Sequence, residues 1–140
     1  MKSQVVIIGG GLIGCELAMK LADQPGKKIT VVEMLDELAG DSEVFSRWTL
    51  TGWLAEEGVS LITGFTVRRV TRDKVVGVDK GGNQRELPYD NVILATGLRS
   101  KEDISDRLKK SIQTYVVGDN LEAGKIIDAV HDGFNVAMKI

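Results

Sequence analysis

The sequence has little of what several classes of functional site require. Its 140 residues include one cysteine and one histidine, which excludes an internal disulfide, a CxxC redox pair and a cysteine- or histidine-based metal site. Lysine and arginine number 18 against 20 aspartates and glutamates, so no basic surface for nucleic acid or an anionic membrane is expected. No apolar run approaches the roughly 18 residues of a membrane span, and no secretory segment opens the chain. We therefore expect a cytoplasmic protein with no metal, nucleic-acid or membrane partner.

Glycine, by contrast, is abundant, and its most informative cluster follows an apolar run. Val5–Ile8 predicts a buried strand, and Gly9–Gly14 reads G-G-G-L-I-G directly after it. In such a turn Gly9 permits the tight bend, Gly11 lets the backbone approach phosphate oxygens, and Gly14 lets the following helix pack closely. The helix N-terminus then offers N–H groups to a pyrophosphate. The pattern predicts a dinucleotide site, but glycine-rich turns are common and the neighbouring residues have to support it.

The residues after the glycines complete this pattern. Apolar residues recur at helical spacing over Leu12–Ala22, and a Pro-Gly pair ends the predicted helix. A second β-type run, Ile29–Val32, closes on Glu33, at an offset from the first glycine close to the roughly 20 residues typical of a ribose-binding acid. A carboxylate there accepts hydrogen bonds from ribose hydroxyls and repels a 2′-phosphate, and Met34 follows where an NADP site often has arginine. The sequence therefore favours NADH over NADPH, whereas the plainer interpretation of Glu33 is a polar strand terminus.

The rest of the chain predicts an α/β fold with a Rossmann-like parallel sheet of about five strands flanked by helices. The expected elements are a helix over Glu43–Glu57, a strand over Val59–Ile62, an antiparallel β-meander at about residues 65–88, strands over Asn91–Leu94 and Thr114–Val117, a short helix within residues 101–110 and a last helix from about Gly124. The meander serves as the crossover to Asn91–Leu94, because three short β-type segments follow one another with no helix between them. Ala95-Thr96-Gly97 then supplies small residues where a ligand approaches the sheet edge.

Four other side chains have both a chemical and a plain interpretation. Trp48 and Trp53 suit an adenine platform, but packing of a crossover helix against the core is the simpler explanation. Cys15 follows the glycines at a helix N-terminus, which lowers a thiol pKa, yet it equally suits a buried helix face. His131 has no partner suggested by the sequence, so an ordinary histidine on a helix surface is a simpler interpretation than a catalytic one. The Tyr-x-x-x-Lys pair of a short-chain dehydrogenase does not occur. We predict no catalytic residue.

Five features occur together in one order: Gly9–Glu16, Glu33, the meander, Ala95-Thr96-Gly97 and Gly118-Asp119. This combination resembles the NADH-binding domain of the flavoproteins with two dinucleotide-binding domains, the pyridine nucleotide-disulfide oxidoreductase superfamily. Within it, Thr30–Met34 and the segment from Val117 to Val130 resemble the C-terminal part of old-yellow-enzyme-type NADH:flavin oxidoreductases such as the 2,4-dienoyl-CoA reductases.

The resemblance implies one dinucleotide-binding domain over residues 1–140. Residues of about 1–97 match its NADH-binding core, and residues of about 112–140 match the segment that returns to the FAD domain. Glu16 matches a glutamate near the nicotinamide, and Asp119 matches an acid that contacts FAD in the intact protein. The residues predicted to bind cofactors are Gly9, Gly10, Gly11, Leu12, Ile13, Gly14, Glu16, Glu33, Met34, Ala95, Thr96, Gly97 and, for FAD, Asp119.

The predicted function is to position NADH for hydride transfer to FAD in a flavin-dependent oxidoreductase. The chain lacks a first FAD fingerprint, an FMN barrel and iron–sulfur cysteines, so we expect a fragment that is inactive alone. Its partner would be the remainder of the parent flavoprotein, namely the FAD domain and, in the old-yellow-enzyme branch, an FMN barrel. Two alternatives stay open: a non-catalytic NAD(H)-sensing regulatory domain, and a minimal FAD-binding domain that uses the same glycine-rich loop.

Overall fold

The computed structural model describes residues 3–40, 42–101 and 104–140. Contacts divide the chain between Gly97 and Leu98 into two compact units, which are described separately. The first unit contains β1 (Ser3–Ile8), α1 (Leu12–Ala22), β2 (Lys27–Val32), α2 (Val44–Glu56), β3 (Ser60–Ile62), β4 (Thr66–Val70), β5 (Lys74–Val78), β6 (Gln84–Pro88) and β7 (Asn91–Leu94). The second contains α3 (Ser105–Leu108), the short 3₁₀ turn η1 (Gly118–Asn120) and α4 (Ile126–Ala137).

Four strands form the parallel sheet of the first unit, in the order β3-β2-β1-β7. Ile8, at the end of β1, pairs with Val32 of β2 on one side and with Leu94 of β7 on the other. The chain adds β2 and β3 on one side of β1 and then returns to β7 on the other, so the direction of strand addition reverses at β1. Open α/β sheets bind ligands at such a reversal, outside the carboxyl ends of the strands.

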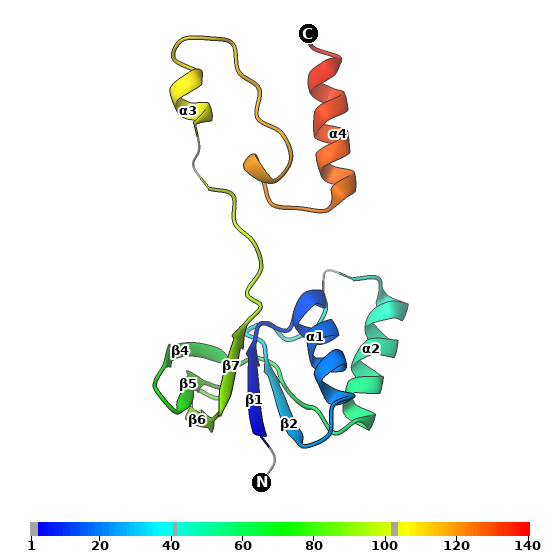
Figure 1. The fold of residues 1–140 in the computed structure, drawn as a ribbon, viewed down its shortest axis with the longest axis vertical. Helices are drawn as coiled ribbons and strands as arrows, with labels where there is room; N and C mark the ends of the chain where they lie inside the picture. The colour runs from blue at the N-terminus through cyan, green and yellow to red at the C-terminus, as the bar shows by residue number, and fades with distance from the viewer. Residues whose placement is uncertain (1–2, 41, 102–103) are drawn as a thin grey trace. The chain divides into compact units, whose positions relative to one another are not determined.

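Side chains of β1 alternate between two layers, which explains why its sequence is apolar throughout. Val5 and Ile7 pack on the helix side of the sheet, whereas Val6 and Ile8 pack on the meander side. The helix-side cluster also contains Cys15, Ala18, Ile29, Val31 and Leu54, and the meander-side cluster contains Val32, Phe65 and Val75. Figure 1 shows α1 and α2 on one face of the parallel sheet and β4, β5 and β6 on the other. The predicted α/β architecture with an antiparallel meander is confirmed.

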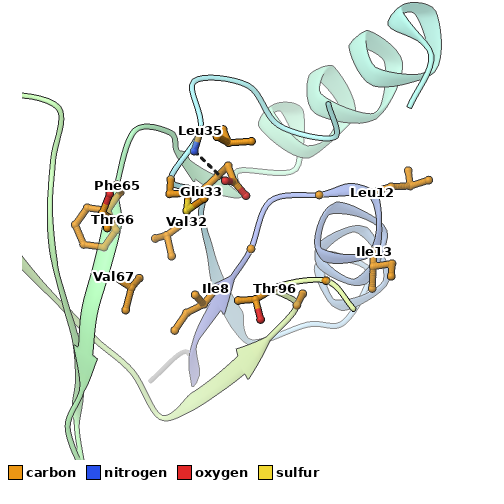
Figure 2. A pocket seen from close by; sticks show the side chains of 15 residues that line it. Ile8, Leu12, Ile13, Val32, Glu33, Leu35, Phe65, Thr66, Val67 and Thr96 are labelled. Carbon is orange, nitrogen blue, oxygen red and sulfur yellow. Dashed lines mark hydrogen bonds between the residues drawn. The ribbon is translucent and has the colours of Figure 1, made fainter. Parts of the chain in front are cut away.

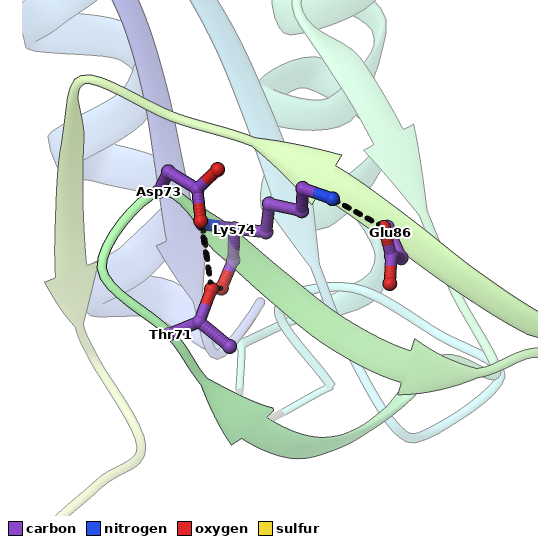
Figure 3. A network of polar contacts seen from close by, with 4 residues as sticks. All are labelled: Thr71, Asp73, Lys74 and Glu86. Carbon is purple, nitrogen blue, oxygen red and sulfur yellow. Dashed lines mark hydrogen bonds and ion pairs between the residues drawn. The ribbon is translucent and has the colours of Figure 1, made fainter.

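The meander is a separate three-stranded sheet in the order β4-β5-β6. Its first turn is closed by Thr71, whose Oγ1 accepts a hydrogen bond from the Lys74 N–H at 3.1 Å and donates to Asp73. The Lys74 ammonium contacts the Glu86 carboxylate on β6 at 2.8 Å, and this contact raises the pKa of Lys74 above its usual value. Figure 3 draws the two side chains and the contact between them. In the second turn the Asp79 carboxylate accepts hydrogen bonds from the N–H groups of Asn83 and Gly81, which lowers the pKa of Asp79.

Two expectations from the sequence are wrong. The parallel sheet has four strands, because residues 114–117 form an irregular segment in place of a fifth strand. A run of β-forming residues becomes a strand only when its backbone groups meet the edge of another strand, and no described strand pairs with this run. Trp48 does not pack in the core: it is 71% exposed, whereas Trp53 contacts the helix-side cluster as expected.

In the second unit, α4 carries a row of exposed apolar residues at helical spacing: Ile126, Val130, Phe134 and Met138. The helix begins where the Lys125 N–H donates to the Asp128 carboxylate at 2.8 Å. The predicted short helix within residues 101–110 is present as α3. No residue that the structure describes in this unit is buried. Among all the described residues, no helix is both long and apolar enough to cross a membrane.

The two faces of α2 provide a test of this packing. Leu54 is fully buried, so Leu54→Ala is expected to lower the free energy of unfolding by about 2–5 kcal/mol through lost contacts and a residual cavity. Trp48→Ala, on the exposed face of the same helix, should change it by no more than about 0.5 kcal/mol. Urea unfolding followed by circular dichroism measures both values. Equal losses in the two variants would contradict this placement of α2.

Candidate functional site

A cavity of about 370 Å³ opens at the carboxyl ends of β1, β2 and β7. It is lined by the turn after β1 and the start of α1, by the residues around Glu33 after β2, by residues 95–97 after β7 and by residues 65–67 around the start of β4. Figure 2 shows these side chains around the opening. All of them belong to the first unit, and the cavity lies where the direction of strand addition reverses.

The glycines of the turn allow close approach of three elements. Gly9 has a φ of +108°, and a Cβ on it would lie 2.2 Å from the Ala95 carbonyl oxygen at the end of β7. A Cβ on Gly14 would lie 2.0 Å from the Gly9 carbonyl oxygen, so α1 packs directly on the turn. Gly11 is the N-cap of α1 and lines the cavity together with Leu12 and Ile13. The positive end of the α1 dipole is therefore at the cavity wall, where it favours a phosphate group.

Glu33 is held in place by two backbone N–H groups. Its Oε2 accepts from Gly10 at 2.7 Å, and its Oε1 accepts from Leu35 at 2.9 Å, the contact drawn in Figure 2. Each carboxylate oxygen has further lone-pair capacity for hydroxyl donors. Glu33 is also the one ionisable side chain among the residues that line the cavity. The site therefore suits a ligand with hydroxyl groups, and it offers no pair of ionisable groups for acid–base chemistry.

Gly10 connects the glycine turn to the loop after β2. A Cβ on it would lie 2.3 Å from Cδ2 of Leu38, and its carbonyl oxygen accepts hydrogen bonds from the Ala39 N–H at 2.7 Å and the Cys15 thiol at 3.3 Å. Ala39 is fully buried and has a φ of +46°, an unusual conformation for a residue with a side chain. Cys15 is fully buried, in agreement with its plainer interpretation as part of a packed helix face.

The structure brings most of the predicted cofactor-binding residues to this cavity. The predicted residues that line it are Gly9, Gly11, Leu12, Ile13, Glu33, Met34, Ala95, Thr96 and Gly97. Gly10 and Gly14 belong to the turn and to the start of α1 but do not line the cavity. Glu16 is exposed on α1 and does not line it either. Asp119 belongs to the second unit, where it is exposed and accepts a hydrogen bond from the Gly124 N–H at 3.4 Å. His131 is also exposed there, on α4.

Sequence reasoning missed the wall that the meander contributes. The lining residues outside the prediction are Ile8, Val32, Leu35, Phe65, Thr66 and Val67. The backbone places this wall beside the acid, because the Phe65 N–H donates to the Glu33 carbonyl at 2.8 Å and the Gly64 N–H donates to the Leu35 carbonyl at 2.9 Å. One signal in the sequence was available for this wall. Gly64 comes shortly after β3, at the edge of the sheet where residues 95–97 follow β7.

The pyridine nucleotide-disulphide oxidoreductase family matches residues 1–125. The chain belongs to this family. It is 40% identical to an NADH oxidase of Thermoanaerobacter brockii over 142 aligned residues, which cover 98% of this chain and 21% of that protein. It is 37% identical to a bilirubin reductase of Mediterraneibacter gnavus, with 96% of this chain and 21% of the relative covered.

Solved structures agree with this family membership. An FAD-dependent pyridine nucleotide-disulphide oxidoreductase from Desulfovibrio vulgaris is 35% identical, with a TM-score of 0.58 over 70% of this chain and 25% of that one. A 2-naphthoyl-CoA reductase gives a TM-score of 0.80 at 27% identity, over 100% of this chain and 21% of that one. This family member thus spans about a fifth of the length of the curated relatives named above.

Two glycines inside helices of this oxidoreductase-family chain provide a matched test of the turn. Gly14→Ala is expected to destabilise the fold by about 1–3 kcal/mol, because the new methyl group meets the Gly9 carbonyl. Gly52→Ala in α2, which has nothing within 4 Å, should instead stabilise the fold by up to about 1 kcal/mol through higher helix propensity. Urea unfolding measures both changes. A stabilising Gly14→Ala would show that α1 does not pack on the turn.

Proposed function

We propose that this chain is the NADH-binding domain of a flavin-dependent oxidoreductase and positions the nicotinamide for hydride transfer to FAD. The observation that carries the proposal is the cavity itself, in which the glycine turn, the amino end of α1 and the fixed Glu33 carboxylate meet. The NADH oxidase and reductase relatives support an oxidoreductase role.

In this proposal the residues of the chain bind and orient. Gly9 and Gly11 place backbone beside the pyrophosphate, and the start of α1 stabilises its negative charge. The Glu33 carboxylate accepts hydrogen bonds from the adenosine ribose hydroxyls. The small residues Ala95 and Gly97 leave room for the extended cofactor at the end of β7. Hydride donation and acceptance are supplied by NADH and FAD when bound, so the contribution of this chain is orientation.

Charges around Glu33 favour NADH over NADPH. The loop after Glu33 carries Asp36 and Glu37, and each forms an ion pair with a cation of another element: Lys80 contacts Asp36 at 2.7 Å, and Arg47 contacts Glu37. Both cations are thus paired with carboxylates of this loop. A 2′-phosphate next to Glu33 would meet the negative charge of its carboxylate, and these two cations already have carboxylate partners.

The remainder of a parent flavoprotein is the partner in this proposal. The chain spans about a fifth of its relatives, and the apolar row on α4 suits packing against sequence outside it. We assign residues of about 112–140, with Asp119, to the part of the chain that returns to the FAD domain. We further place the parent among the old-yellow-enzyme-type enzymes with an FMN barrel, on the sequence similarity of residues 30–34 and 117–130. The chain alone is then a binding module without turnover.

Substitution of Glu33 tests the proposed site. Glu33→Gln and Glu33→Ala should raise the Kd for NADH by about 10- to 150-fold, because hydrogen bonds to a charged acceptor contribute about 1.5–3 kcal/mol. The preference for NADH over NADPH should shrink in both variants. Fluorescence titration of the purified chain with each nucleotide measures these values.

The exposed Glu57 at the end of α2 provides the control, since Glu57→Gln should leave the Kd unchanged. Unchanged NADH affinity in both Glu33 variants would remove the assignment of the ribose site. An absorbance spectrum of the purified chain separates the proposal from the alternative of an FAD-binding domain, which predicts a yellow protein that retains flavin.

A further inference from the structure

Gly77 lies in the middle strand of the meander, outside every nucleotide-binding motif. It pairs with Val67 of β4 and Arg85 of β6. It is not among the glycines with a positive φ, so its backbone conformation does not require glycine. Glycine weakens a strand, and within one it often marks a place where another group approaches closely.

The group that approaches Gly77 is the ring of Phe65. A Cβ at position 77 would lie 2.5 Å from Cε1 and 2.5 Å from Cζ of that ring, and 2.7 Å from the Thr66 carbonyl oxygen. These distances are far shorter than a van der Waals contact, so any larger residue at position 77 has to displace the ring. The Phe65 ring therefore occupies the space where a side chain at position 77 would lie.

Phe65 is 1% exposed and forms part of the cavity wall. Away from Gly77, the ring belongs to the cluster that contains Val6, Val32 and Val75. Figure 2 shows it near Val32 and Val67, on the side of the opening where Glu33 and Leu35 lie. Since protein interiors are closely packed, the cavity is the open space that this ring borders.

We infer that Gly77 is a positioning residue of the nucleotide site, which seats the Phe65 ring in the cavity wall and so sets the room left for the adenine base. The inference rests on the proposed function, in which Glu33 binds the adenosine ribose. It adds that the base lies along the wall formed by residues 65–67, because the Phe65 N–H is hydrogen-bonded to the Glu33 carbonyl. A methyl group at position 77 pushes the ring toward that base. The meander thus sets the shape of the site through a residue that does not line it.

The first test compares NADH with its 1,N6-etheno derivative, whose adenine carries an additional fused ring. Gly77→Ala should raise the Kd for NADH by about tenfold, the order expected when the contact of one base is disturbed. The ratio of the etheno-NADH Kd to the NADH Kd should also rise, because the narrowed cavity discriminates against the larger base. Phe65→Leu should lower that ratio, because leucine lacks the outer ring carbons.

The double variant Gly77→Ala/Phe65→Leu separates positioning from general damage. Leucine has no Cε1 or Cζ to meet the new methyl group, so the double variant should recover NADH affinity relative to Gly77→Ala and return the ratio toward the wild-type value. Gly52→Ala, the same change where nothing lies within 4 Å, should leave affinity and ratio unchanged. Circular dichroism of each variant shows whether it is folded. If Gly77→Ala does not fold, the ratios in Phe65→Leu and in the double variant decide.

Three results would overturn the inference. The first is an unchanged Kd ratio in Gly77→Ala. The second is an equal loss of affinity for NADH and etheno-NADH in Gly77→Ala that the added Phe65→Leu substitution does not restore. The third is an unchanged Kd ratio in Phe65→Leu. Failure of the wild-type chain to bind NADH would instead remove the proposed function, and this inference with it. Wild-type binding with no effect at position 77 would remove only the role of Gly77.

Discussion

The hydrogen bond from the Gly10 N–H to the Glu33 carboxylate joins the glycine turn to the acid across 23 residues of sequence. It depends on the parallel pairing of β1 with β2, in which Ile8 lies beside Val32 and both strands end at one edge. It also requires that residue 10 have no side chain, because Leu38 and Glu33 occupy the space where a Cβ would lie. The same Gly10 anchors Ala39 and Cys15 through its carbonyl. The orientation of the carboxylate therefore follows from backbone geometry.

The meander covers the face of the parallel sheet opposite α1 and α2, and its first strand also borders the cavity. Strand β4 starts at the carboxyl edge of the sheet because the Phe65 N–H donates a hydrogen bond to the Glu33 carbonyl. The apolar wall and the acid therefore have a fixed spacing. The Phe65 ring packs against Gly77, so the position of β5 determines where this ring lies in the wall. In this first unit the meander therefore both completes the hydrophobic core and forms one wall of the cavity.

Local rules were sufficient to predict the turn, the acid and the small residues after β7. A strand, a glycine turn, a helix and a second strand follow in short steps, so Gly9–Gly14 and Glu33 reach the same edge by topology alone. Residues 65–67 were missed, because their place at the cavity depends on packing of the meander against the sheet, which no local pattern specifies. Residues 114–117 were predicted as a strand from composition, although a strand also needs a neighbouring edge. Trp48 was assigned to the core because helical spacing does not tell which of two apolar-looking faces of α2 is covered.

The two units of the chain differ in what their described residues form. Every residue that lines the cavity precedes Leu98, so the cavity belongs entirely to the first unit. A segment as short as the second unit has too little interior to form a core, which agrees with the absence of buried residues in its described part and with the exposed row on α4. The exposed apolar side chains of this unit would contribute to stability if further protein surface covered them. Since Glu33 is bonded to two N–H groups and is the one ionisable group at the cavity, the first unit has a fixed acceptor for hydroxyl groups and no proton-transfer pair. In the proposed function, a site of this kind contributes to hydride transfer through the geometry in which it holds the nucleotide.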